Sequence, residues 1–172
     1  MKKLISQETG YEITKLGLYQ IFGGSIGILV LIWGIFKSNN FSGFIILIYL
    51  LVLIFFLYSI FCGTLCLKTE KNALVHSLTN QLIQVIGFAI FGFAFKYFAG
   101  LYFTFGINLT ESIKSGFGVG ISKFNFNFNI EKDRLEIDFN LIALAIIYWI
   151  DKLMKKVREE KALRQALTIG DT

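Results

Sequence analysis

Two long uncharged blocks limit most strongly what this chain can fold into. Residues 16–36 read LGLYQIFGGSIGILVLIWGIF, and residues 44–67 read FIILIYLLVLIFFLYSIFCGTLCL, with no charged side chain in either. As helices rising about 1.5 Å per residue, each block covers the roughly 30 Å hydrocarbon core of a bilayer. Only residues 37–43 connect them, so the sequence predicts a helical hairpin that crosses a membrane rather than a large soluble core.

Two further apolar blocks are interrupted by charge. Residues 82–105 are uncharged except for Lys96, and residues 139–157 contain an uncharged run only as far as Asp151. The last block spans if the lysines that follow it reach to the interface, and an interfacial helix is the competing interpretation. The sequence therefore predicts one integral all-α membrane domain over residues 1–172, with four transmembrane helices at about 16–36, 44–67, 82–105 and 139–157 and a tail at 158–172.

The segment between the third and fourth blocks alternates with a period of two. Phe124, Phe126, Phe128 and Ile130 fall on one face of SKFNFNFNI, and RLEIDF alternates again after the polar EKDR. Such alternation is typical of a half-buried strand. It predicts a small extracytoplasmic β-hairpin at about 122–139, between helices three and four. The hairpin would cap its own bundle, or pair through its edge with a second copy or another protein.

The positive charge follows the apolar blocks. Most lysines and arginines lie in the N-terminal flank, in the connection after residue 67 and in the C-terminal tail. Cytoplasmic loops are enriched in these residues, so both termini are expected in the cytoplasm of a multi-pass plasma-membrane protein. The net charge of +5 is explained by these flanks. The lipid bilayer is therefore the expected partner, and no nucleic acid is expected.

Lys96 is the one charge inside the predicted third span. Charged residues within a span are costly and often functional. On a helix, Lys96 shares a face with Gly92 and Gly100, and its depth directs it outward toward Asp138 or Glu136. A structural ion pair is the leading interpretation. A role in the passage of an ion or substrate, and a contact with another membrane protein, remain open alternatives.

Small residues form a stripe on the first block. Gly23, Gly27 and Gly34 fall within 40° of one another on a helical wheel, at about 100° per residue. Glycines let helix backbones approach closely in a membrane, either within the chain or between two copies as a homo-oligomer. Gly92 and Gly100 are assigned the same packing role on the third predicted span.

Residues that could carry chemistry are few. Cys62 and Cys66 are spaced i, i+4, which is not a redox spacing, and His76 is not placed to complete a zinc site with them. The sequence contains no nucleophile–base pair, phosphate-binding loop or metal-ligand cluster. We therefore expect no enzyme: no catalytic, cofactor-binding or metal residue is assigned, and the two thiols are interpreted as packing groups.

Short motifs in the second half resemble a known family. Thr69-Glu-Lys-Asn72 follows the second block, IDFNLIALAIIYWI precedes the basic tail, and Leu167-Thr-Ile169 lies near the end. In these the chain resembles the small bacterial four-span membrane proteins called domain of unknown function twenty-nine seventy-five. The resemblance implies a bacterial plasma-membrane protein, often encoded beside a small helix-turn-helix regulator, and it implies no reaction.

The leading functional hypothesis is a non-enzymatic membrane protein that acts through a membrane or cytoplasmic protein partner, such as a regulator. A small transporter or channel subunit is the alternative, motivated by Lys96 and the glycine stripes. A membrane immunity or defence role is also compatible with the sequence.

Overall fold

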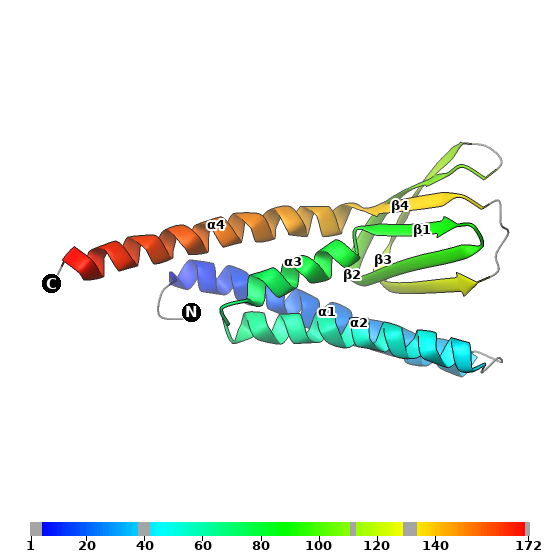
Figure 1. Ribbon diagram of the computed structural model, residues 1–172, viewed down its shortest axis with the longest axis horizontal. Coiled ribbons are helices and arrows are strands. Elements are labelled where there is room, and N and C mark those ends of the chain that lie inside the picture. The colour runs from blue at the N-terminus through cyan, green and yellow to red at the C-terminus, as the bar shows by residue number, and fades with distance from the viewer. Residues whose placement is uncertain (1–4, 38–41, 111–112, 129–133, 171–172) are drawn as a thin grey trace.

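The computed structural model describes residues 5–37, 42–110, 113–128 and 134–170. Within these residues the helices are α1 (Gln7–Lys37), α2 (Gly43–Leu67), α3 (Ala73–Ile83) and α4 (Leu141–Gly170), and the strands are β1 (Ile86–Ile90), β2 (Phe93–Asn108), β3 (Lys114–Phe128) and β4 (Glu136–Asn140). The α1–α2 hairpin runs along the long axis, as Figure 1 shows. The sheet lies beside the half of this hairpin nearest the α1–α2 connection, and α3 and α4 lie toward the other end (Figure 1).

Two helices are long and apolar enough to cross a membrane among the described residues, α1 and α2. The first two predicted spans lie within them. Their backbones approach closely at Gly17 and Gly63, since a methyl group on Gly17 would lie 2.8 Å from the Gly63 carbonyl oxygen. Ser42 caps the start of α2, where its hydroxyl accepts a hydrogen bond from the Ile45 amide at 3.4 Å.

The third predicted span, residues 82–105, is wrong. The end of α3, all of β1 and most of β2 occupy this segment, and the two strands form an antiparallel hairpin. Phe91 and Gly92 make its two-residue turn with positive φ angles of 53° and 82°, as a type I′ turn requires. From Phe93 to Tyr97, large aromatic residues on one face alternate with Ala94 and Lys96 on the other. This period of two, in a segment rich in aromatic residues, favours a strand over a helix.

The fourth predicted span, residues 139–157, is also wrong. Its first two residues end β4, and α4 begins directly afterwards at Leu141. Asn140 caps α4, where its side-chain oxygen accepts a hydrogen bond from the Ala143 amide at 3.4 Å. Only ten residues separate this cap from the charge of Asp151. The fold is therefore a mixed helix-and-sheet structure and not an all-α bundle of four spans.

The sheet is antiparallel and strongly curved, because β2 bends in the middle. The β2–β3 register shifts between Phe98 and Leu101, and Gly100 at the bend has a φ of +109°. The first half of β2 pairs with β1, the second half pairs with β4, and β1 also pairs with β4. β3 follows β2 on both sides of the bend. The strands therefore form a trough, and the two arms of β3 are its outer edges.

The predicted hairpin at about 122–139 is wrong in its pairing. β3 pairs with β2, whereas β4 pairs with β1 and β2. The alternation did predict strands in both places. Residues 129–133, which include Ile130 and most of the predicted turn, lie outside the described residues.

The two faces of the trough differ in chemistry. Residues opposite each other on antiparallel strands share a face, so the register shows on which face of the sheet each paired side chain lies. The convex face is apolar and carries Phe93, Phe95, Tyr97, Leu101, Phe103, Phe105, Phe117, Val119, Ile121, Phe124, Phe126, Ile137 and Phe139. The concave face carries mainly polar residues and glycines. Helices α1 and α2 cover one side of the convex face, where Tyr97 packs with Phe56 and Leu31 in a buried cluster.

At the other end of the molecule, α4 holds the start of α1. The Glu160 carboxylate accepts hydrogen bonds from the Ser6 amide, the Ser6 hydroxyl and the Thr9 hydroxyl, each at 2.7 Å. Burial raises the pKa of Glu160, but these hydrogen bonds and the charge of Lys156 outweigh it, so the pKa lies below its usual 4.5. A negative charge at a helix N-terminus also complements the helix dipole.

We expect Glu160→Gln to destabilise the protein by roughly 1 kcal/mol at neutral pH, a value reduced by solvent screening. Since folding lowers the pKa of Glu160, its contribution is complete above about pH 4.5 and is lost as the pH falls through the folded-state value. The check is the unfolding midpoint of wild type and variant from pH 7 downward. Their difference should shrink in acid, whereas Glu159→Gln, at the exposed neighbouring acid, should show little difference at any pH.

Candidate functional site

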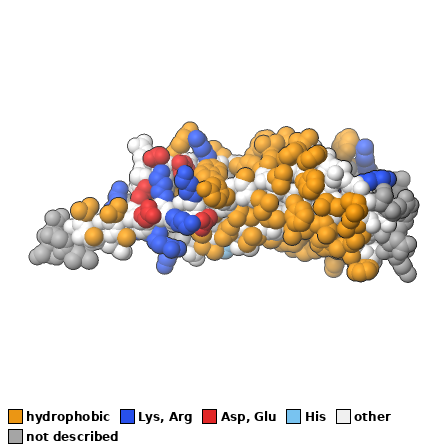
Figure 2. Space-filling model, turned by 90° about the horizontal axis from the view of Figure 1, so that it is seen from above, with side chains coloured by type: hydrophobic (Ala, Val, Ile, Leu, Met, Phe, Trp, Pro, Cys, Tyr) orange, Lys and Arg blue, Asp and Glu red, His pale blue; other side chains and the backbone are white. Residues whose placement is uncertain are grey.

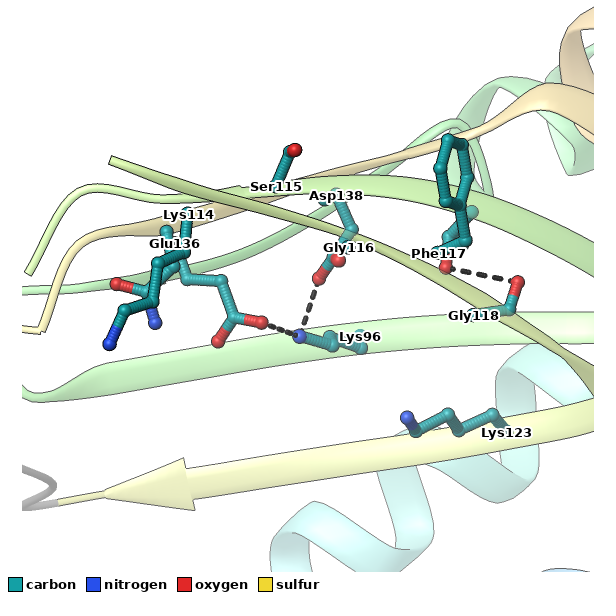
Figure 3. Close-up of a pocket in the computed structure, with 12 residues that line it drawn as sticks. Lys96, Lys114, Ser115, Gly116, Phe117, Gly118, Lys123, Glu136 and Asp138 are labelled. Carbon is teal, nitrogen blue, oxygen red and sulfur yellow. Dashed lines mark hydrogen bonds and ion pairs between the residues drawn. The ribbon is translucent and has the colours of Figure 1, made fainter. Parts of the chain in front are cut away.

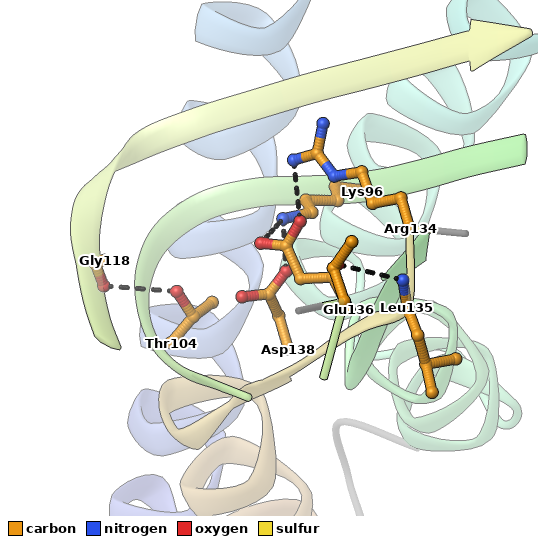
Figure 4. Close-up of polar contacts among 8 residues, drawn as sticks. Lys96, Thr104, Gly118, Arg134, Leu135, Glu136 and Asp138 are labelled. Atoms are coloured by element: carbon orange, nitrogen blue, oxygen red, sulfur yellow. Dashed lines mark hydrogen bonds and ion pairs between the residues drawn. The ribbon is translucent and has the colours of Figure 1, made fainter. Parts of the chain in front are cut away.

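Lys96 forms an ion-pair network with two acids of β4. Its ammonium nitrogen lies 2.8 Å from Glu136 Oε1 and 2.5 Å from Asp138 Oδ2. Only 11% of the Lys96 side chain and 11% of the Asp138 side chain are exposed. Arg134 adds a second cation, with its Nη2 2.8 Å from Glu136 Oε2 (Figure 4). The two acids are those that the sequence places within reach of Lys96, although a strand rather than a helix positions the lysine.

A glycine between the strands lets Lys96 reach Asp138. Gly87 of β1 pairs with Asp138 on one side and lies beside Lys96 on the other. A Cβ atom at Gly87 would lie 3.0 Å from Lys96 Cγ. The Lys96 side chain therefore passes over Gly87, which has no side chain, and its ammonium group forms an ion pair with Asp138 on the strand beyond β1.

Further glycines leave the concave face open. Gly106 of β2 pairs with Asp138 on its other side, and a Cβ atom there would overlap Asp138 Oδ1. Gly116 of β3 pairs with Gly106, and nothing lies within 4 Å of a Cβ placed on it. Glycines alternate with Phe117, Val119 and Ile121 along GFGVGI, so the period of two was present in the sequence. The sequence analysis missed this open strand face because it did not consider these glycines as one side of a strand.

The trough forms a half-open polar cavity of about 300 Å³ beside the ion pair (Figure 3). Its lining residues come from β2, β3 and β4 and are Lys96, Thr104, Gly106, Asn108, Lys114, Ser115, Gly116, Phe117, Gly118, Lys123, Glu136 and Asp138. Lys114 and Lys123 lie on the two arms of β3. Glu136 and Asp138 neutralise part of this charge, so the lining keeps a positive excess.

No protein-family model matches the chain, and comparisons with curated proteins and with solved structures also gave no match. The resemblance drawn from the motifs at 69–72 and 167–169 therefore stays a prediction.

A chain of buried polar groups connects the bend of β2 to α1, α2 and α3. The Ala99 amide donates to Gln84 Oε1 at 2.7 Å, and Gln84 Nε2 donates to the Asn80 carbonyl at 3.1 Å. Asn80 Nδ2 donates to Ser59 Oγ at 3.2 Å, which in turn donates to the Gln20 carbonyl at 3.1 Å. These bonds satisfy polar groups in an apolar setting and hold the bend against α1, α2 and α3. No sequence spacing indicated this network.

The predicted packing glycines have different roles in the structure. Gly23 lies against the bend of β2, where a Cβ atom would be 2.5 Å from the Gly100 nitrogen. A Cβ atom at Gly27 would overlap the Phe56 ring. Gly34 has open space around it, and Gly92 is part of the β1–β2 turn. Gly23 and Gly100 thus meet as helix on strand, not as two helices.

The remaining candidates lie on α2 and α3. Cys62 and Cys66 are free and buried, and Cys66 Sγ lies 3.2 Å from Ser77 Oγ. His76 Nδ1 lies 3.2 Å from the Tyr58 hydroxyl. Within the described part of the chain, no three potential metal ligands gather in one place. The Lys96 network in its cavity is therefore the strongest candidate site.

Proposed function

We propose that the protein crosses the membrane through α1 and α2 and that its sheet lies at membrane depth. The concave face of the sheet then forms a polar chamber through which small anions pass. The observation that carries this proposal is the sheet itself, which is apolar outside and charged inside. An antiparallel sheet on a soluble core usually exposes its polar face. Apolar-outside, polar-inside strands are typical of β-structure in a membrane.

The position of the sheet along α1 supports membrane depth. The bend of β2 contacts Gly23, and the far end of the sheet reaches Phe44, whose ring centroid is 6.5 Å from that of Phe126. From Gly23 to the end of α1 at Lys37 the helix rises about 21 Å. The sheet therefore lies beside the C-terminal part of the uncharged block 16–36, not beyond it.

The exposed surface supports the same placement. Phe117 and Val119 on the sheet are 72% and 78% exposed, as much as Leu47 and Trp33 on the helices, at 63% and 65%. One view of the surface shows a broad hydrophobic band, with the acidic and basic side chains gathered mainly at the α4 end (Figure 2). Monomeric soluble proteins rarely expose so extensive an apolar surface, and lipid is the environment that suits it.

The charges of the cavity favour anions. The charge of Lys96 is balanced by Glu136 and Asp138. Within the residues that the structure describes, no ion pair joins Lys114 or Lys123 to an acid, and both lysines are exposed at the cavity. Lysine and arginine side chains select anions in pores. The chamber thus combines a fixed ion pair with two lysines that remain available to an anion.

The test is ion efflux from proteoliposomes, with chloride and potassium as the two probes. Chloride efflux should exceed potassium efflux. The double variant Lys114→Met/Lys123→Met should reduce chloride efflux by about tenfold or more, equivalent to roughly 1.4 kcal/mol in the barrier. The matched control, Lys68→Met/Lys71→Met, removes the same charge from the exposed α2–α3 connection and should leave efflux unchanged. The absence of protein-dependent flux, or equal flux in both double variants, would contradict the proposal.

A second candidate function, action through a protein partner, is favoured by the end of α4. This part of α4 extends past the other helices (Figure 1), and Leu163 and Leu167 are 66% and 71% exposed, one turn apart. The two leucines offer an apolar stripe on a helix outside the proposed membrane region. A tagged chain purified from its native membrane should recover one specific protein, and Leu163→Asp/Leu167→Asp should lose it. Recovery that is the same for both forms would count against this candidate.

A further inference from the structure

The outer edge of β3 is the least covered part of the sheet. Within the described residues β3 pairs with β2 alone, so its other edge has no strand beside it. Helix α1 reaches β3 at Ser122, whose hydroxyl donates to the Gly23 carbonyl at 2.8 Å, and beside Phe124. Residues 114–117, Val119 and Ile121 are exposed. The first arm of β3 therefore presents a free strand edge of about seven residues.

A free edge has different consequences in water and in lipid. Its backbone N–H and C=O groups bind water at an aqueous surface. In hydrocarbon no water can satisfy these groups, and lipid-exposed sheet edges are not found there. The inference that follows rests on the proposed position of the sheet at membrane depth. At that depth the first arm of β3 requires another strand.

We propose that this strand is β3 of a second copy, paired antiparallel about a two-fold axis near Gly118. In this register Phe117 faces Val119 of the partner subunit, an aromatic and β-branched pair of the kind that stabilises antiparallel sheets. The concave positions then match glycine with glycine, since Gly116 faces Gly120 of the partner subunit. Lys114 lies just beyond the seven paired residues, so the two Lys114 side chains lie at opposite ends of the interface and do not repel each other.

The same symmetry keeps the two faces of the sheet separate. An antiparallel pair about an axis perpendicular to the sheet preserves the alternation of side chains. Phe117, Val119 and Ile121 of both copies therefore stay on the convex, lipid-facing side. The two concave faces join into one polar interior that contains both Lys96 networks. The contact is isologous, as in most homodimers.

The test is disulfide cross-linking in proteoliposomes that contain two differently tagged copies, one with Phe117→Cys and the other with Val119→Cys. Opposed residues of an antiparallel pair lie within the roughly 4.4–6.8 Å Cα separation that a disulfide requires. We expect a cross-linked dimer that carries both tags. The control pairs Leu47→Cys with Leu51→Cys on the exposed face of α2 and should give a several-fold lower yield. The native Cys62 and Cys66 are buried and stay in every variant.

Subunit counting by photobleaching in nanodiscs provides an independent measurement, with two copies per disc expected. A single copy per disc, equal cross-linking of the control pair, or a cross-link to a different protein in native membranes would overturn the dimer. The chloride assay separates the two proposals. Chloride flux from single copies would support the anion chamber and contradict the dimer. Cross-linked dimers without chloride flux would support the dimer and contradict the anion chamber.

Discussion

Replacing Lys96 with methionine is expected to destabilise the protein by roughly 3 to 5 kcal/mol, the usual cost of removing one partner from a buried ion pair. The loss leaves Asp138, whose side chain is 11% exposed, without its cation. Glu136 keeps Arg134 and is affected less. For a chain of this length the change corresponds to a fall of the order of 10 °C in the unfolding midpoint. Thermal unfolding in detergent and in nanodiscs measures it.

A matched neutral network separates the loss of charge balance from the loss of packing. In Lys96→Met/Glu136→Gln/Asp138→Asn, no member of the triad carries an unpaired charge. We expect this variant to recover most of the stability that the single variant loses. If Lys96→Met is as stable as wild type, or if the triple variant is no more stable than the single one, the network does not have the energetic role that its geometry indicates.

Gly23→Leu is expected to separate α1 from the sheet. A Cβ atom at Gly23 would lie 2.5 Å from the Gly100 nitrogen and 2.6 Å from the Ala99 carbonyl carbon. These are backbone atoms at the bend of β2, so they have little freedom to move. Overpacking of a close contact costs about 1–3 kcal/mol, and the larger value is expected where backbone is displaced. The unfolding midpoint should fall accordingly.

Gly34→Leu is the control on the same helix. Nothing lies within 4 Å of a Cβ atom at Gly34. Both substitutions give α1 the same gain in helix propensity, somewhat less than the roughly 0.8–1 kcal/mol that separates glycine from alanine. Gly34→Leu should therefore keep or slightly raise the unfolding midpoint. Equal effects of the two substitutions would show that the contact between Gly23 and β2 does not hold the sheet.

Part of the fold could be predicted from the sequence because local length and polarity decide it. The uncharged runs within α1 and α2 are each long enough for a bilayer, and the structure folds both as helices long and apolar enough to cross a membrane. The strand at Phe124–Phe126 was predicted from strict alternation. In both cases the signal lies within neighbouring residues.

For residues 82–105, prediction from local length and polarity was wrong. The length of the block suggested a helix, and Lys96 was accepted as a single exception. The same residues also alternate from Phe93 onward, but hydrophobicity alone does not distinguish a long apolar strand from a helical span. The partner strands decided between them, because β1 and β4 lie on either side of the bend in β2. Neither partner is identifiable from the local sequence.

The site was predicted in part for the same reason. Lys96 stood out because a charge in an apolar segment needs a partner. Asp138 and Glu136 were named from their depth, and the structure places both within 2.8 Å of its ammonium nitrogen. The other half of the site was missed. Gly87 and Gly106 make room for this contact, and Lys114 and Lys123 approach the cavity from separate arms of one strand.

By itself the sequence determined that two segments are long and apolar enough for a membrane, that one charge lies among aromatic residues, and that period-two strands follow. Composition and spacing act between residues close in the chain, so these features need no knowledge of the fold. Only the tertiary structure decided that the third apolar block is mainly a hairpin of β1 and the bent strand β2. It also decided that the apolar side of β2 faces outward while Lys96 faces a cavity. The reason is that strand pairing joins residues far apart in the chain, such as Ile86 with Phe139 and Thr104 with Asn140. The register between strands, rather than the local sequence, sets which side chains share a face.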